Sequence, residues 1–129
     1  DYDRAIELKP VHSDAYYNRG LAREAQGDHA GAIGDYGRAI ELKPDDAEAY
    51  SNRGNTRAAQ GDFAGAMRDY DRAIELDPRL WQAWSNRGLV VAQLGRKDEA
   101  RESFEKALSC CPENVRATIE AARRQALGE

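Results

Sequence analysis

The chain has 129 residues, of which 41% are hydrophobic and 33% charged, and its formal net charge is −4. This composition is ordinary for a globular domain and allows one continuous core. Acidic and basic residues are interspersed, so no basic patch predicts nucleic-acid binding. No apolar run approaches the roughly 20 residues that cross a membrane. We therefore expect a partner that is neither a nucleic acid nor a membrane.

The chain opens inside a helical pattern, without a secretory leader, and we expect it to be part of a longer protein. A first helix at about 2–9 is predicted to form a half repeat over 1–12. Helix pairs follow at about 14–26 with 30–43, 47–60 with 64–77, and 81–94 with 98–111. A closing helix is predicted at about 115–127, with Ala117 and Ala121 packed against the last pair. The pairs define repeats over 13–46, 47–80 and 81–114, followed by a capping segment over 115–129.

Local punctuation supports these bounds. Gly27 supplies a left-handed stop, and Asp28 is a candidate N-cap for the next helix. Pro44 stops the second helix of the first pair, because proline disfavours helical geometry in the residue before it. Asp45 or Asp46 is then predicted to cap the following helix.

The strongest signal is a repeat of 34 residues that holds column by column. The columns contain glycine, proline, alanine or a large aromatic residue. They are Gly20, Gly54 and Gly88; Gly27, Gly61 and Gly95; Pro10, Pro44, Pro78 and Pro112; Ala5, Ala39, Ala73 and Ala107; Ala32, Ala66 and Ala100; Tyr16, Tyr50 and Trp84; and Tyr2, Tyr36, Tyr70 and Phe104.

This order of residues resembles the tetratricopeptide repeat (TPR) signature, as in the stretches at 50–54 and 73–78. The resemblance implies an all-α, right-handed solenoid, in which Gly20, Gly54 and Gly88 let paired helices approach closely. It also implies a protein-binding scaffold that is not an enzyme and has no cofactor.

In this family the first helix of each pair lines a concave groove, which assigns candidate partner-binding residues. They are Asp14, Tyr17, Asn18, Leu21, Glu48, Asn52, Asn55, Gln82, Asn86 and Leu89. The resemblance makes the groove acidic at one end, near Asp14, Glu24 and Glu48, and basic at the other, near Arg116, Arg123 and Arg124. A ligand with basic residues toward the first repeat is expected.

Asn18, Asn52 and Asn86 recur every 34 residues, and we call them the asparagine ladder. The ladder resembles the one in the TPR superhelix of O-linked N-acetylglucosamine transferase. In one interpretation these amides bind a peptide backbone, since an amide both donates and accepts hydrogen bonds. In the other, they bond neighbouring helices and only order the stack.

A second family use, the carboxylate clamp of heat-shock co-chaperones, is not expected here. It needs lysine or arginine in the first and third repeats. The matching positions hold Tyr17 and Leu21 in the first repeat, and Gln82 and Asn86 in the third.

Arg19, Arg53 and Arg87 form another column, and Asp35 and Asp69 recur in the second helices. Buried pairs within each repeat, Arg19 with Asp35 and Arg53 with Asp69, would explain both columns. The alternative is exposed pairing of each aspartate with Arg38 or Arg72, three residues on. Arg87 needs a different partner, because Ser103 replaces the aspartate.

The remaining features predict no chemistry. Gly31, Gly34 and Gly37 lie at three-residue steps, either for close approach of a partner or on a solvated face. Cys110 is interpreted as core and Cys111 as exposed; two lone thiols fit a reducing compartment such as the cytoplasm. No metal site is expected, since the two histidines are isolated.

The predicted function is therefore a scaffold that binds a peptide segment of a partner protein in its groove. Two alternatives stay open. One is a structural module that self-assembles weakly through an uncapped N-terminal end. The other is an appendage that recruits substrates to an enzyme elsewhere in a longer protein.

Overall fold

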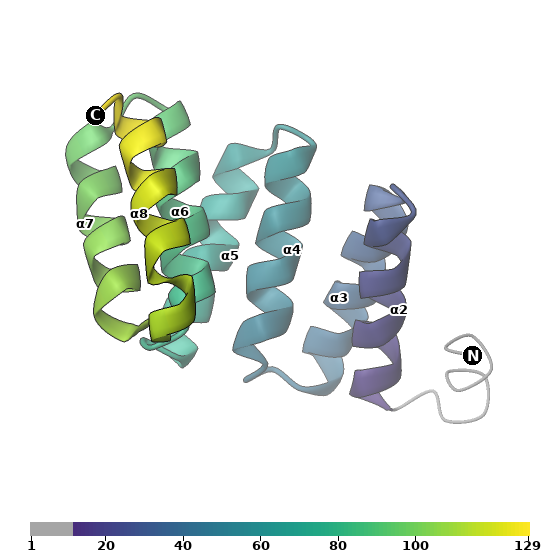
Figure 1. Ribbon diagram of the computed structural model, residues 1–129. Helices are drawn as coiled ribbons and strands as arrows, with labels where there is room; N and C mark the ends of the chain where they lie inside the picture. Colours follow the sequence, from purple (N-terminus) through teal and green to yellow (C-terminus); the bar gives the residue numbers. More distant parts are fainter. Residues whose placement is uncertain (1–11) are drawn as a thin grey trace.

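The computed structural model describes residues 12–129, and this part of the chain consists of helices joined by short turns, without a strand (Figure 1). The helices are α2 (Ser13–Ala25), α3 (His29–Leu42), α4 (Ala47–Ala59), α5 (Phe63–Leu76), α6 (Trp81–Gln93), α7 (Lys97–Cys110) and α8 (Glu113–Leu127). Their bounds lie within two residues of those predicted. The expected all-α helical repeat solenoid is confirmed.

Consecutive helices pack as pairs, α2 with α3, α4 with α5, and α6 with α7 (Figure 1). Within each pair the turn contains a glycine with left-handed geometry, at φ 81° for Gly27, 83° for Gly61 and 81° for Gly95. Three aspartates cap helix N-termini, since Asp28, Asp46 and Asp62 accept hydrogen bonds from backbone N–H groups three residues on.

Large rings pack directly over the glycine column. Tyr36, Tyr70 and Phe104 have at most 1% of their surface exposed. A methyl group placed on Gly54 would lie 2.9 Å from the Tyr70 ring and 3.2 Å from the Ala66 carbonyl oxygen. The glycine is therefore required by the close approach of the two helices, as the sequence predicted.

A buried carboxylate joins the two helices of each of the first two pairs. Arg19 binds Asp35 through Nε and Nη2, at 2.8 and 2.7 Å, and Arg53 binds Asp69 in the same way, at 3.0 and 2.8 Å. The predicted pairing within repeats is confirmed, and it is bidentate. Arg38 and Arg72 pair instead with glutamates on the solvated surface.

The aspartates have a second arginine partner that was not predicted. Arg23 Nη1 lies 3.1 Å from Asp35, and Arg57 Nη1 lies 2.8 Å from Asp69. The two-arginine arrangement disappears in the third pair, where Val91 and Ser103 occupy the corresponding positions.

Arg87 has three partners in the third pair. It donates to Ser103 and Glu99 within the pair and reaches back to Asp71 on α5 at 2.9 Å. Glu99 stands where the first two repeats have Gly31 and Gly65. A carboxylate lost at one position is thus replaced by another that the same arginine can reach.

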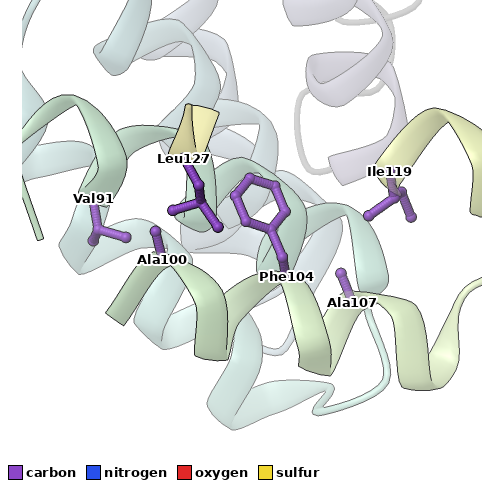
Figure 2. Close-up of a cluster of buried hydrophobic side chains, with 6 residues drawn as sticks. All are labelled: Val91, Ala100, Phe104, Ala107, Ile119 and Leu127. Atoms are coloured by element: carbon purple, nitrogen blue, oxygen red, sulfur yellow. The ribbon is translucent and has the colours of Figure 1, made fainter. Parts of the chain in front are cut away.

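Helix α8 closes the stack by packing on both α6 and α7 (Figure 1). Figure 2 shows the Phe104 ring between Leu127 and Ile119 of α8, beside Ala100 and Ala107 of α7. Val115, Ala122 and Ala126 complete this contact. The expectation that Ala117 and Ala121 would face the last pair is wrong, because both are exposed. The buried residues of the helix are Ile119 and Leu127 instead.

The two cysteines also differ from expectation. Both are half-buried, and it is Cys111 that packs against the core of the last pair, whereas Cys110 bonds to backbone carbonyl groups of its own helix. Cys111 is turned inward because the helix ends at Cys110 and the chain becomes extended at the next residue.

The half repeat at 1–12 and the uncapped end lie almost entirely outside the described residues, as does self-association through them. Within the described part, no helix is long and apolar enough to traverse a bilayer.

Gly34 offers a test of the solvated face of α3. It is exposed, and a methyl group added there would have no atom within 4 Å outside its own helix and neighbours. Gly34→Ala is expected to raise the free energy of unfolding by roughly 0.5–1 kcal/mol, because alanine loses less backbone entropy in a helix. Urea denaturation measures the change.

The control is Gly31→Ala in the same helix. Its methyl group would meet the Asp28 carboxylate that caps α3. This variant should gain nothing or lose stability. Equal stabilisation by both substitutions would contradict the assigned environments.

Candidate functional site

Three pockets lie along the face made by the first helices of the pairs and by α8, and we call this surface the groove face. The first, of about 500 Å³, lies at the N-terminal ends of α2 and α4. The second, of about 310 Å³, lies between α2, α4 and the start of α6. The third, of about 770 Å³, lies between the C-terminal halves of α4, α6 and α8.

The first pocket, the acidic pocket, is lined by five carboxylates. They are Asp14, Asp45, Asp46, Glu48 and Asp77. Lys43 is the one cation among the described residues that line it. Asp46 caps α4 and Asp77 accepts a hydrogen bond from a backbone N–H group. The carboxylates of Asp14, Asp45 and Glu48 form no ion pair or hydrogen bond with any residue in 12–129.

The second pocket, the middle pocket, is lined by an amide and a phenol that are bonded to each other. Asn52 Nδ2 donates to Tyr17 Oη at 2.7 Å, which links α4 to α2. Burial raises the pKa of Tyr17, and the negative charges of Glu48 and Asp46 raise it further, whereas the bond from Asn52 lowers it. The phenol therefore stays protonated and keeps its O–H as a hydrogen-bond donor.

The third pocket, the apolar pocket, is lined mainly by small and aliphatic side chains. They are Ala58, Ala59, Leu89, Val90, Ala92, Ala122 and Ala126, with amides at Asn55, Asn86, Gln93 and Gln125. Leu89 is 40% exposed, although it is a large apolar residue. No charged side chain of residues 12–129 lines this pocket.

Nine of the ten predicted partner-binding residues line these pockets. Asp14, Tyr17 and Glu48 line the acidic pocket; Tyr17, Leu21, Glu48, Asn52 and Gln82 line the middle pocket; and Asn55, Asn86 and Leu89 line the apolar pocket. Asn18 is half-buried and lines none of the three.

The asparagine ladder is not uniform. The Asn52 amide bonds to Tyr17 of the preceding repeat, so it helps to order the stack. The side chains of Asn18 and Asn86 form no hydrogen bond with any described residue. Asn55, which lies outside the ladder, accepts a hydrogen bond from the Tyr70 hydroxyl at 2.6 Å.

The expected charges at the two ends of the groove need correction. Glu24 does not line a pocket, because its carboxylate accepts hydrogen bonds from Thr56 and Tyr36 between the first two repeats. Arg116 donates to the Leu108 carbonyl oxygen and pairs with Glu120. Neither Arg116 nor Arg123 nor Arg124 lines the apolar pocket, so they contribute no charge to its lining.

Several lining residues were missed by sequence reasoning. Asp45, Asp46 and Asp77 lie in the turns between pairs, and Ala122, Gln125 and Ala126 come from α8. The turns were considered only for capping. The α8 residues were missed because the inward face of that helix was assigned wrongly.

The part of the chain from residue 12 onward contains no group of three or more histidine, cysteine, aspartate or glutamate residues placed to hold a metal ion. The carboxylates of the acidic pocket are thus not arranged as a cation cage.

Solved structures resemble this fold. The Arabidopsis OM64 TPR domain is 26% identical, with a TM-score of 0.82, and the match covers 88% of this chain and 93% of that one. The first TPR of Spaghetti (RPAP3) bound to the HSP90 peptide SRMEEVD is 27% identical, with a TM-score of 0.81, covering 91% and 96%. MamA is 29% identical, with a TM-score of 0.78, covering 91% and 63%.

Comparison with family models agrees with this likeness. Models described as tetratricopeptide repeat match residues 51–115 and 1–34, and one described as TPR repeat matches residues 24–61. No curated protein matches the chain. The first of these models alone spans half of the chain, over the same columns whose packing is described above. The chain therefore belongs to the tetratricopeptide repeat family.

Proposed function

We propose that this chain is a protein-interaction scaffold and that its groove face binds a peptide segment of a partner protein. The observation that carries the proposal is the set of pockets along one face, where large apolar residues are left uncovered. Leu21 and Leu89, which occupy the same column two repeats apart, are 38% and 40% exposed. Apolar pockets with a few polar groups are the usual form of a binding site.

The polar groups on this face suit a peptide backbone. Since Asn52 Nδ2 donates to Tyr17, the side-chain oxygen of Asn52 remains free to accept a hydrogen bond, and the Tyr17 hydroxyl remains free to donate one. One peptide unit offers the complementary N–H donor and C=O acceptor. Asn86 adds an amide that no described residue occupies. The proposal includes the resemblance of the asparagine ladder to the one in the TPR superhelix of O-linked N-acetylglucosamine transferase.

The structurally similar TPR of Spaghetti binds an HSP90 peptide, which shows that a related fold takes a short segment. A carboxylate clamp would need lysine or arginine at positions that are occupied in this chain by Tyr17, Leu21, Gln82 and Asn86. We therefore propose a different peptide, held by side-chain and backbone contacts along the groove face.

Selection from a random 12-residue peptide library displayed on phage tests this function directly. Peptides that bind the immobilised chain are synthesised, and their dissociation constants are measured by calorimetry. The double variant Asn52→Ala/Asn86→Ala is expected to weaken binding by roughly ten- to a hundredfold, since each amide–backbone bond contributes about 0.5–1.5 kcal/mol.

The single variants separate binding from stability. Asn86→Ala should weaken binding without changing the urea midpoint, because no described residue bonds to its amide. Asn52→Ala should also lower stability, since it removes the bond to Tyr17. Leu94→Ala is the control, because Leu94 is 42% exposed but lines none of the pockets. Failure to select any peptide that is sensitive to Asn86 or Leu89 would contradict the proposed function.

A further inference from the structure

The acidic pocket and the apolar pocket lie at opposite ends of one face, and their chemistry differs sharply. Five carboxylates and one lysine line the acidic pocket, whereas no charged residue of 12–129 lines the apolar pocket. The middle pocket connects them: it shares Tyr17 and Glu48 with the acidic pocket, and its Asn52 lies one helical turn from Asn55 of the apolar pocket.

We propose that the groove ligand is an extended peptide with a lysine or arginine at one end and a large apolar residue at the other. The basic side chain occupies the acidic pocket, and the apolar side chain enters the pocket beside Leu89. This inference rests on the proposed function, because it specifies the sequence of the peptide that the groove face binds.

Charge complementarity supports the basic residue. Asp14, Asp45 and Glu48 form no ion pair in the described part of the chain, and Lys43 is the one cation among five carboxylates, so a ligand cation would supply a counter-charge that this pocket lacks. The apolar side chains near these carboxylates can pack against the long side chain of a lysine or arginine. Tyr17 and Leu21 lie beside Glu48 in the middle pocket, where they can contact the methylene groups of a lysine or arginine. Burial is the largest cause of the raised pKa of Tyr17, and the negative charges of Glu48 and Asp46 raise it further.

Helix geometry sets the spacing of the two ligand residues. Glu48 and Ala58 are ten positions apart on α4, which corresponds to about 15 Å along the helix axis. An extended peptide covers roughly 3.3–3.6 Å per residue. The basic and apolar residues of the ligand are therefore expected at least four positions apart.

The phage-selected peptides provide the first test, because their sequences are known. They should be enriched in peptides that carry lysine or arginine four or more positions from leucine, phenylalanine or another large apolar residue. Synthetic versions with the basic residue changed to glutamine, or with the spacing cut to two, are expected to bind at least about fivefold more weakly.

Matched variants of the chain provide the second test. Asp14→Asn/Glu48→Gln should weaken binding by roughly three- to tenfold at low salt and reduce the dependence of affinity on salt concentration. Glu102→Gln/Glu105→Gln changes the net charge equally but lies on the exposed surface of α7, away from the pockets, and should have no effect. Leu89→Gln should weaken binding about tenfold, whereas Leu94→Gln should not.

The outcomes distinguish this inference from the function beneath it. Peptides that depend on Leu89 and Asn86 but are indifferent to Asp14 and Glu48, and that lack a basic residue, would overturn the inference and leave the proposed function intact. A library that yields no peptide sensitive to any groove-face variant would overturn both.

Discussion

Replacing Asp69 with alanine is expected to lower the free energy of unfolding by about 3 kcal/mol. The carboxylate is only 4% exposed and holds Arg53 and Arg57 at 2.8 Å each. Removing it leaves two partly buried guanidinium groups without their shared acceptor. It also removes a contact between α4 and α5. The loss should lie at the lower end of the usual range for a broken buried pair, because the arginines keep 19% and 25% of their side-chain surface exposed.

Urea denaturation followed by circular dichroism measures this change, with an unchanged slope showing that the unfolding reaction is the same. Glu75→Ala is the matched control. Its carboxylate pairs with Arg72 at 3.0 Å on the solvated surface of the same helix, and such pairs contribute under about 1 kcal/mol. Equal losses from both variants would show that the Asp69 pair is no stronger than a surface contact.

Replacing Phe104 with alanine is expected to cost about 3–5 kcal/mol. The ring is fully buried, packs over Gly88 and fills the space between α7 and α8 (Figure 2). The cavity would lie beside Ile119 and Leu127, the two buried residues of α8. The closing helix should therefore lose protection from amide hydrogen exchange more than α2 and α3 do.

Leu94→Ala removes a leucine that is 42% exposed and should change the midpoint little. A loss under about 1 kcal/mol for Phe104→Ala, or uniform loss of exchange protection along the chain, would contradict the assignment of this ring to the junction between the last pair and its cap.

The helices could be predicted closely because their limits are set by local chemistry. Glycine in left-handed geometry and an aspartate cap act within a few residues, so Gly27 and Asp28 mark the same turn in the sequence and in the structure. The buried arginine–aspartate pairs were one of two pairings that the columns allowed, and the structure has them rather than the exposed pairing with Arg38 and Arg72. Arg23 and Arg57 recur at the same spacing, and their loss at Val91 accompanies the loss of the aspartate at Ser103, so the second partner was detectable too.

The groove face was predictable only in part. Repeat alignment predicts on which helix face a residue lies, but not which hydrogen bonds its side chain forms. Asn52 and Asn86 occupy the same column, yet Asn52 has Tyr17 before it in the stack, whereas the preceding position for Asn86 holds Ser51. The repeat columns did not identify the whole buried face of α8. Its own spacing of Val115, Ile119, Ala122 and Ala126 was the better guide to its buried face.

The contacts between the first and second repeats differ from those between the second and third. This difference determines which repeat could be duplicated within the array. Thr56 of the second repeat bonds to Glu24 of the first, whereas Val90, at the equivalent place in the third, packs with Ala58 of the second. A tandem copy of the third repeat would set Val90 against Ala92, an apolar match of the same kind. A copy of the first would set Ala22 against Glu24 and leave that carboxylate without the threonine hydroxyl that now bonds to it. Lengthening of this array is therefore expected to be tolerated at the third repeat and to be penalised at the first.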